Sequence, residues 1–218
     1  LTILPLRDII IFPHMIFPIL IGRQPSLKAV AEAVERDKYI FVSAQRNPNV
    51  EDPEFKDIYK YGTISKIIQV LRLPNNLLKV LVEGLFQSRI AKQIKNKEYL
   101  EAEIKRIDLN YNEKDQELQA LIRHTSELFS TYIKQNHNLP SDLYAAYENI
   151  NDPERKLFFA AANIQQKVDV KQRILEQRTL KKQYFEISSI LSKELELLKI
   201  EAEIGTKVHD TIQKTQKK

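Results

Sequence analysis

The hydrophobic period of this chain changes once along its length, and that change constrains the fold more than any other feature. Up to residue 107, short runs rich in β-branched and aromatic residues are typical of strands. From residue 113 onward, apolar residues recur at the spacing of amphipathic helices. We place a domain boundary in Asp108–Asn112, with a β-rich domain over residues 1–110 and a helical domain over residues 111–218. The predicted fold class is therefore α+β.

The first domain is predicted to be a small, partly closed barrel or sandwich with one helix. Asn75-Asn76 is expected to form a two-residue hairpin turn, because asparagine tolerates positive φ, and Gly84 is expected to end the next strand. Ser26 is the expected N-cap of the helix, whose shared face would hold Leu27, Val30, Ala31 and Val34. The predicted strands are Tyr39–Gln45, Thr63–Leu73, Leu77–Glu83, Ser88–Ile94 and Ala102–Ile107.

The second domain is predicted to be a helical bundle that ends in a long helix. Asp152-Pro153 indicates a helix start, because aspartate caps well and proline suits the first helical position. The last helix is expected to pack its apolar stripe within its own domain; a stalk leading to another domain is the alternative. The predicted helices are Glu113–Gln135, Asp142–Ile150, Lys156–Gln166, Val170–Gln177 and one from Thr179 to beyond Ile204.

No residue pattern indicates catalysis, and we assign no catalytic, cofactor-binding or metal-ligating residue. The chain has no cysteine, and its four glycines form neither of the two common nucleotide-binding loops. Four scattered histidines show no zinc-binding spacing, and no serine lies in a GxSxG motif. A serine–lysine dyad stays open, since its partners need only meet in space. The apolar run Ile9–Ile21 is too short, and too rich in proline, to span a membrane.

What remains is apolar surface suited to binding other proteins. The segment between Pro13 and Pro18 is expected either to fill the barrel as a kinked strand or to expose its tip for binding. The hairpin near residues 73–78 is a second candidate surface, with arginines as a polar rim. The predicted substrate-binding residues are Pro13, Met15, Ile16, Phe17, Arg23, Leu73, Pro74 and Leu77.

Two stretches resemble a known family. LPLRDIIIFPHMIFPILIGR (Leu4–Arg23) and GTISKIIQVLRLPNNLLKVLVEGLFQSRI (Gly62–Ile90) are similar to the N-terminal domain of Lon, the ATP-dependent protease. The helical half agrees more loosely, at IND-P (Ile150–Pro153) and in the last helix. The hairpin departs from the family pattern, since Asn75-Asn76 stands where Asp-Gly is common.

The resemblance implies a PUA-like pseudo-barrel, a helical bundle and a long exit helix. It also implies capture of unfolded, damaged or degron-bearing proteins and self-association within a cytoplasmic homo-hexamer. In the family, ATPase and Ser-Lys protease modules follow, and they use ATP and magnesium; no cofactor is expected in these 218 residues, and no enzymatic activity. The alternative is a PUA-like module that binds nucleic acid. It is less favoured, because the net charge of +5 is spread over interleaved acidic and basic residues.

Overall fold

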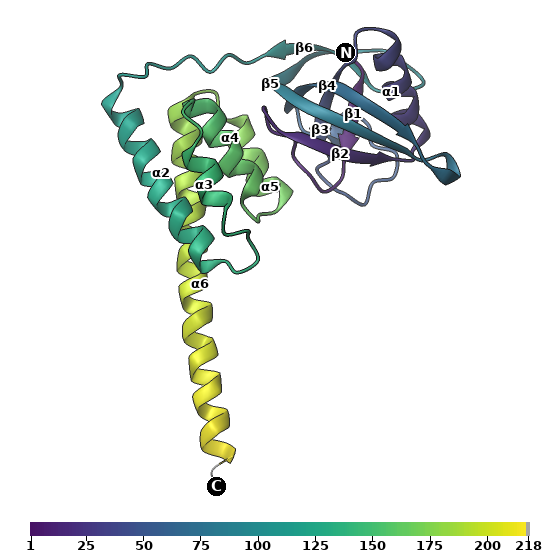
Figure 1. Ribbon diagram of the computed structural model, residues 1–218. Helices are drawn as coiled ribbons and strands as arrows, with labels where there is room; N and C mark the ends of the chain where they lie inside the picture. Colours follow the sequence, from purple (N-terminus) through teal and green to yellow (C-terminus); the bar gives the residue numbers. More distant parts are fainter. Residues whose placement is uncertain (217–218) are drawn as a thin grey trace.

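The strands form one curled sheet with one helix beside it, and the other helices form a bundle, as the computed structural model shows for residues 1–216 (Figure 1). The sheet order is β1-β3-β4-β5-β2, and β6 also pairs with β5. β1 runs parallel to β3, and the other pairs are antiparallel. The predicted α+β architecture is confirmed. The strands are β1 (Ile3–Leu6), β2 (Ile16–Ile21), β3 (Tyr39–Ala44), β4 (Tyr61–Arg72), β5 (Leu78–Ile94) and β6 (Glu101–Arg106).

The helix of the sheet domain, α1 (Gln24–Glu35), begins earlier than predicted. Arg23 takes the N-cap position and Pro25 lies in the first turn, where its missing N–H leaves no helical bond unmade. Ser26 is therefore buried inside the helix, and the prediction that it caps the helix was wrong. The prediction of its buried face was also partly wrong. Ala31 and Val34 are exposed, so the buried face is rotated about the helix axis from the predicted one. The buried residues are Ser26, Ala29, Val30 and Ala33.

Gly84 does not end a strand, because β5 runs through it without a break. A Cβ at this position would collide with the carbonyl oxygen of Phe12. The His14 N–H donates to the Gly84 carbonyl and the Gly84 N–H donates to the Met15 carbonyl, both at 2.8 Å. Glycine is therefore required by the close crossing of residues 12–15 over β5.

The β4–β5 hairpin closes through a three-residue turn, Pro74–Asn76, which forms a short 3-10 turn. The expected positive φ is present at Asn75 (63°) and Asn76 (59°). The predicted two-residue loop was nevertheless too short, because the Leu73 N–H bonds the Leu77 carbonyl at 2.8 Å and leaves Pro74 in the loop.

Two helices of the bundle start at aspartate caps. Asp115 accepts N–H groups of Glu117 and Leu118, so α2 begins after it and not at residue 113 as predicted. Asp152 accepts the Arg155 N–H at 2.7 Å, which confirms the predicted start at Asp152-Pro153. The helices are α2 (Gln116–Gln135), α3 (Leu143–Glu148), α4 (Pro153–Asn163), α5 (Val168–Glu176) and α6 (Leu180–Gln216).

The first portion of α6 packs its apolar stripe within its own domain, as expected for the last helix. Its first turns bury Tyr184, Ile187 and Leu191, and Leu195 and Leu198 pack against the same cluster. From residue 199 to residue 216 every side chain is exposed, and the helix projects away from the bundle (Figure 1).

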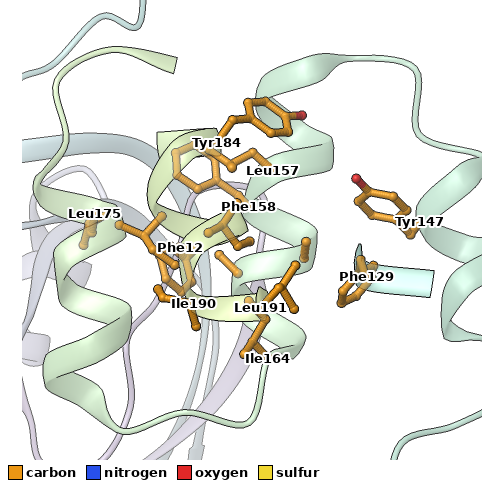
Figure 2. Packing of buried hydrophobic residues seen from close by; sticks show 14 of the residues in the cluster. Phe12, Phe129, Tyr147, Leu157, Phe158, Ile164, Leu175, Tyr184, Ile190 and Leu191 are labelled. Carbon is orange, nitrogen blue, oxygen red and sulfur yellow. The ribbon is translucent and has the colours of Figure 1, made fainter. Parts of the chain in front are cut away.

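The sheet and the bundle share a core. Phe12 is fully buried among residues of the helices, with its ring centroid 5.9 Å from that of Phe158 (Figure 2). The buried Gln87 side chain of β5 donates to the carbonyls of Leu175 (2.5 Å) and Gln177 (2.8 Å). Gln183 of α6 in turn donates to the Gln87 side-chain oxygen at 2.7 Å. The junction is therefore held by both apolar packing and buried hydrogen bonds.

Candidate functional site

A groove of about 880 Å³ lies where the start of β2 meets the helical bundle. Its sheet side comes from residues 13–17, and its helical side comes from α4 and the end of α3. Four predicted site residues are therefore brought together in one place. The apolar lining consists of Pro13, Met15, Ile16, Phe17, Ala146, Ile150, Phe158, Phe159 and Ala162.

The side chains from Pro13 to Phe17 pack partly against the core of the sheet domain and partly face the groove. Pro13 is buried, and Met15 and Phe17 are half-buried against the core of the sheet domain. Ile16 is 57% exposed. The segment thus combines the two expectations, since one side fills the barrel while the other faces solvent.

Polar residues form the rim of the groove: His14, Asn149, Asn151, Asp152, Arg155 and Asn163. Two of them contact residues outside the groove. His14 Nε2 lies 3.9 Å from a carboxylate oxygen of Glu154, and the imidazole lies beside the Phe158 ring at 6.5 Å between centroids. Tyr111 donates its hydroxyl to Asp152 at 3.4 Å. Burial, followed by the nearby Asp152 carboxylate, raises the pKa of Tyr111 to about 12. The groove therefore has an apolar floor and a rim that can hydrogen-bond a polypeptide.

A second exposed apolar surface covers the outside of β2, β5 and β4; we call it the outer face. The strand register places Leu20 and Leu71 on either side of Lys79, and Pro18 and Gln69 on either side of Leu81. Leu20 is 63% and Leu71 50% exposed. A shallow groove of about 250 Å³ lies on this face, lined by Pro18, Gln69, Leu71, Lys79 and Leu81.

Sequence reasoning missed Leu20 and Leu71. The sequence of β2 is apolar throughout, so the exposure of Leu20 between the buried Ile19 and Ile21 had no counterpart in the residue pattern. The helical side of the groove, including Phe158 and Phe159, gave no signal, because apolar residues at helical spacing look the same whether they face a core or a groove.

The predicted hairpin residues lie at the end of the outer face. Pro74 is exposed, while Leu73 and Leu77 are half-buried. The Leu77 side chain lies over Gly22, where a Cβ would be 2.8 Å from Leu77 Cδ2. Leu77 thus packs the hairpin onto the segment that follows β2.

Arg23 is placed in a structural network. Its guanidinium donates to the Pro5 carbonyl (2.9 Å), the Gln45 side-chain oxygen (2.7 Å) and the Glu51 carbonyl (3.1 Å). Burial is the main cause that lowers the pKa of Arg23. These bonds join β1, β3 and the loop after β3, which commits the guanidinium to holding the barrel.

Two of the edge strands of the curled sheet, β1 and β2, are blocked by proline. β1 carries Pro5, whose carbonyl is occupied by Arg23, and β2 carries Pro18. Proline has no N–H to offer an incoming strand, and natural sheets use it to block edge pairing. Contacts to another chain along β1 and β2 are therefore expected mainly through side chains.

Within residues 1–216, no three His, Asp or Glu side chains come together in a way that could hold a metal ion. No helix among the same residues is long and apolar enough to cross a membrane.

The fold and these surfaces define a class: a curled sheet locked to a helical bundle, with exposed apolar surface at and beside the junction. Solved structures of this class share the fold. The N-terminal domain of the Lon protease of the Mycobacterium avium complex matches with a TM-score of 0.69 and 18% identity, covering 88% of this chain and 97% of that one. The Lon N-terminal domain protein of Xanthomonas campestris matches with a TM-score of 0.61 and 12% identity, covering 87% and 96%.

The sequence comparisons then fix the family. The model of the ATP-dependent protease La (LON) substrate-binding domain matches residues 1–193. The Lon protease of Halothermothrix orenii is 37% identical over 92% of this chain and 26% of its own length. The Lon protease of Buchnera aphidicola is 36% identical over 100% of this chain and 28% of its own. The chain belongs to the LON substrate-binding domain family, and it spans about a quarter of the length of these relatives.

Proposed function

We propose that this chain captures unfolded, damaged or degron-bearing proteins for a Lon-type protease of which it forms the recognition part. The observation that carries the proposal is the exposed apolar surface of the groove and the outer face, in a family named for substrate binding. Native proteins bury their apolar side chains, and unfolded ones expose them. A surface of this kind therefore selects for the unfolded state.

The recognition part is proposed to act together with the other modules of the full-length enzyme. The ATPase and Ser-Lys protease modules elsewhere in the full-length protein, which use ATP and magnesium, carry out catalysis. This part carries out no catalysis. The full-length protein is proposed to act in the cytoplasm as a homo-hexamer. Six copies of a weak binding surface would raise the effective concentration of a substrate with several exposed segments, and weak binding at each copy permits later release.

Nuclear magnetic resonance titration tests the proposal. The chain is titrated with a destabilised protein in its unfolded form and, separately, with the native form of the same protein. We expect shifts in the groove and on the outer face with the unfolded form alone, and little change on raising the salt concentration. Nucleic-acid binding is not favoured; it would instead weaken steeply with salt.

Two substitutions locate the surface. Ile16→Asp places a charge in the groove, and we expect it to weaken binding of the unfolded protein by about tenfold, as loss of one buried aliphatic contact would. Phe185→Asp is the matched control, because Phe185 is an exposed aromatic on α6, 68% accessible and outside both surfaces. Equal losses in both variants would contradict the assignment.

A further inference from the structure

The outer face has a positive charge at its centre. Lys79 lies directly between Leu20 on β2 and Leu71 on β4. No carboxylate of residues 1–216 forms an ion pair with Lys79. An exposed ammonium without a partner is thus flanked on both sides by exposed leucines.

The surroundings leave this charge uncompensated. Two rows further along the face, Lys66 and Glu83 stand opposite each other and offset one another. Arg72 follows Leu71 at the end of β4 and is exposed. Arg72 pairs with Leu78, however, and so projects from the opposite side of the sheet. The charged residues of β4 and β5 that lie on the outer face are Lys66, Lys79 and Glu83, a net charge of +1, and β2 has no charged residue.

This arrangement discriminates among apolar polypeptides. A segment that covers Leu20 and Leu71 also covers Lys79 and removes water from its ammonium. Burying a charge without a partner is costly, whereas a carboxylate brought by the segment would offset the cost. A basic segment would add repulsion to the cost of dehydration.

We infer that the outer face selects extended segments in which a carboxylate lies among apolar side chains. The inference rests on the proposed function, and it names the chemical class of substrate for this face. The hairpin turn points away from the helical bundle (Figure 1), so a chain can reach the face without displacing a helix.

Fluorescence anisotropy with three labelled peptides tests the inference. Each has twelve residues with the same leucines, valines and serines, and two positions that are glutamate, glutamine or lysine. We expect the glutamate peptide to bind about five times more tightly than the glutamine peptide, the upper range for an exposed ion pair. The lysine peptide is expected to bind more weakly than both, and added salt to narrow the differences.

Lys79→Glu is expected to invert the order of the three peptides. Lys105→Glu is the matched control, since Lys105 is an exposed lysine on β6, outside the outer face, and it should leave the order unchanged. Lys79→Gln removes the charge without reversing it and should abolish the preference; it covers the case in which Lys79→Glu disturbs folding.

Other results would overturn the acidic preference, the proposed function or the assignment of a polypeptide ligand, as follows. If the three peptides bind equally, or the order persists in Lys79→Glu, the acidic preference is wrong while apolar capture stands. If no peptide binds, the proposed function is wrong, and the inference, which rests on it, is wrong as well. If single-stranded DNA or phosphatidylserine vesicles bind more tightly than the glutamate peptide and lose binding in Lys79→Glu, the face serves a polyanion or a membrane and not an acidic polypeptide.

Discussion

At the scale of single residues, Lys171 is a largely buried lysine whose surroundings change its acid–base chemistry. Its ammonium donates to the Ala162 carbonyl at 3.0 Å, near the end of α4. A cation at a helix C-terminus satisfies a carbonyl that has no helical partner. Burial nevertheless lowers the pKa of Lys171 to about 8.

The lowered pKa predicts a rise in stability with pH. Between about pH 8 and the ordinary lysine pKa near 10.4, the unfolded state binds more protons than the folded state, so the free energy of unfolding increases with pH. Below pH 8 the buried ammonium stays charged, and its dehydration lowers the free energy of unfolding by roughly 3 kcal/mol at most. Lys171→Met should lose this rise, as measured by urea unfolding from pH 7 to pH 10. Lys105→Met should keep the wild-type slope, and parallel curves for all three proteins would refute the assignment.

At the scale of elements, the cap of α4 connects helix stability to the rim of the groove. Asp152 accepts the Arg155 N–H through one oxygen and the Tyr111 hydroxyl through the other. Asp152→Ala should lower the free energy of unfolding by about 1 kcal/mol, the usual value for a lost N-cap, as measured by urea unfolding.

Asp152→Asn separates the two roles of this residue. It keeps a capping oxygen, so we expect little loss of stability, but it removes the negative charge beside Tyr111. The pKa of Tyr111 should then fall below about 12 and remain above the ordinary tyrosine value, because burial is the larger cause. An unchanged phenol titration, followed by ultraviolet absorbance, would show that the charge of Asp152 does not act on Tyr111.

The elements also show what could be predicted from the sequence. The change of period near residue 110, the start of α4 at Asp152-Pro153 and the stripe of α6 were readable, because each depends on residues close in the chain. The continuity of β5 through Gly84 was not, because it depends on Phe12, a residue more than seventy positions away. The choice of which face of α1 is buried likewise depends on how the helix packs against the sheet.

The same distinction holds for the site. The apolar run between Pro13 and Pro18 marked one wall of the groove, because its large apolar side chains lie next to one another in the sequence. The outer face was not predicted, because the exposure of Leu20 and Leu71 follows from the strand register. A shift by one residue would have turned both inward.

At the scale of the whole molecule, Phe12 makes the sheet and the bundle one cooperative structure. It belongs to the sheet domain by sequence, yet it is buried in the cluster built by α2, α4, α5 and α6 (Figure 2). The groove lies directly beside it, since residues 13–17 line one wall and Phe158 the other. The shape of the groove is therefore set by how firmly this ring fixes the two parts together.

Phe12→Ala tests this coupling. Removing the ring should lower the free energy of unfolding by about 3–5 kcal/mol, the range for a large-to-small change in a core. Because the ring contacts the helical cluster, hydrogen exchange should accelerate in α4 and α6 as well as in the crossing segment at residues 12–15. Val42→Ala is the control, since Val42 is buried in the separate core of the sheet domain, and its effect should centre on the strands.

The same variant connects stability to binding. With the junction loosened, the walls of the groove lose their fixed separation, so unfolded protein should bind the groove more weakly even though no residue that lines it has changed. Binding to the outer face should persist, because Leu20, Lys79 and Leu71 are held by the β2–β5–β4 register and not by Phe12. Equal loss at both surfaces would mean that Phe12→Ala unfolds the sheet domain itself, and unchanged exchange in α4 and α6 would mean that the two parts are stable independently.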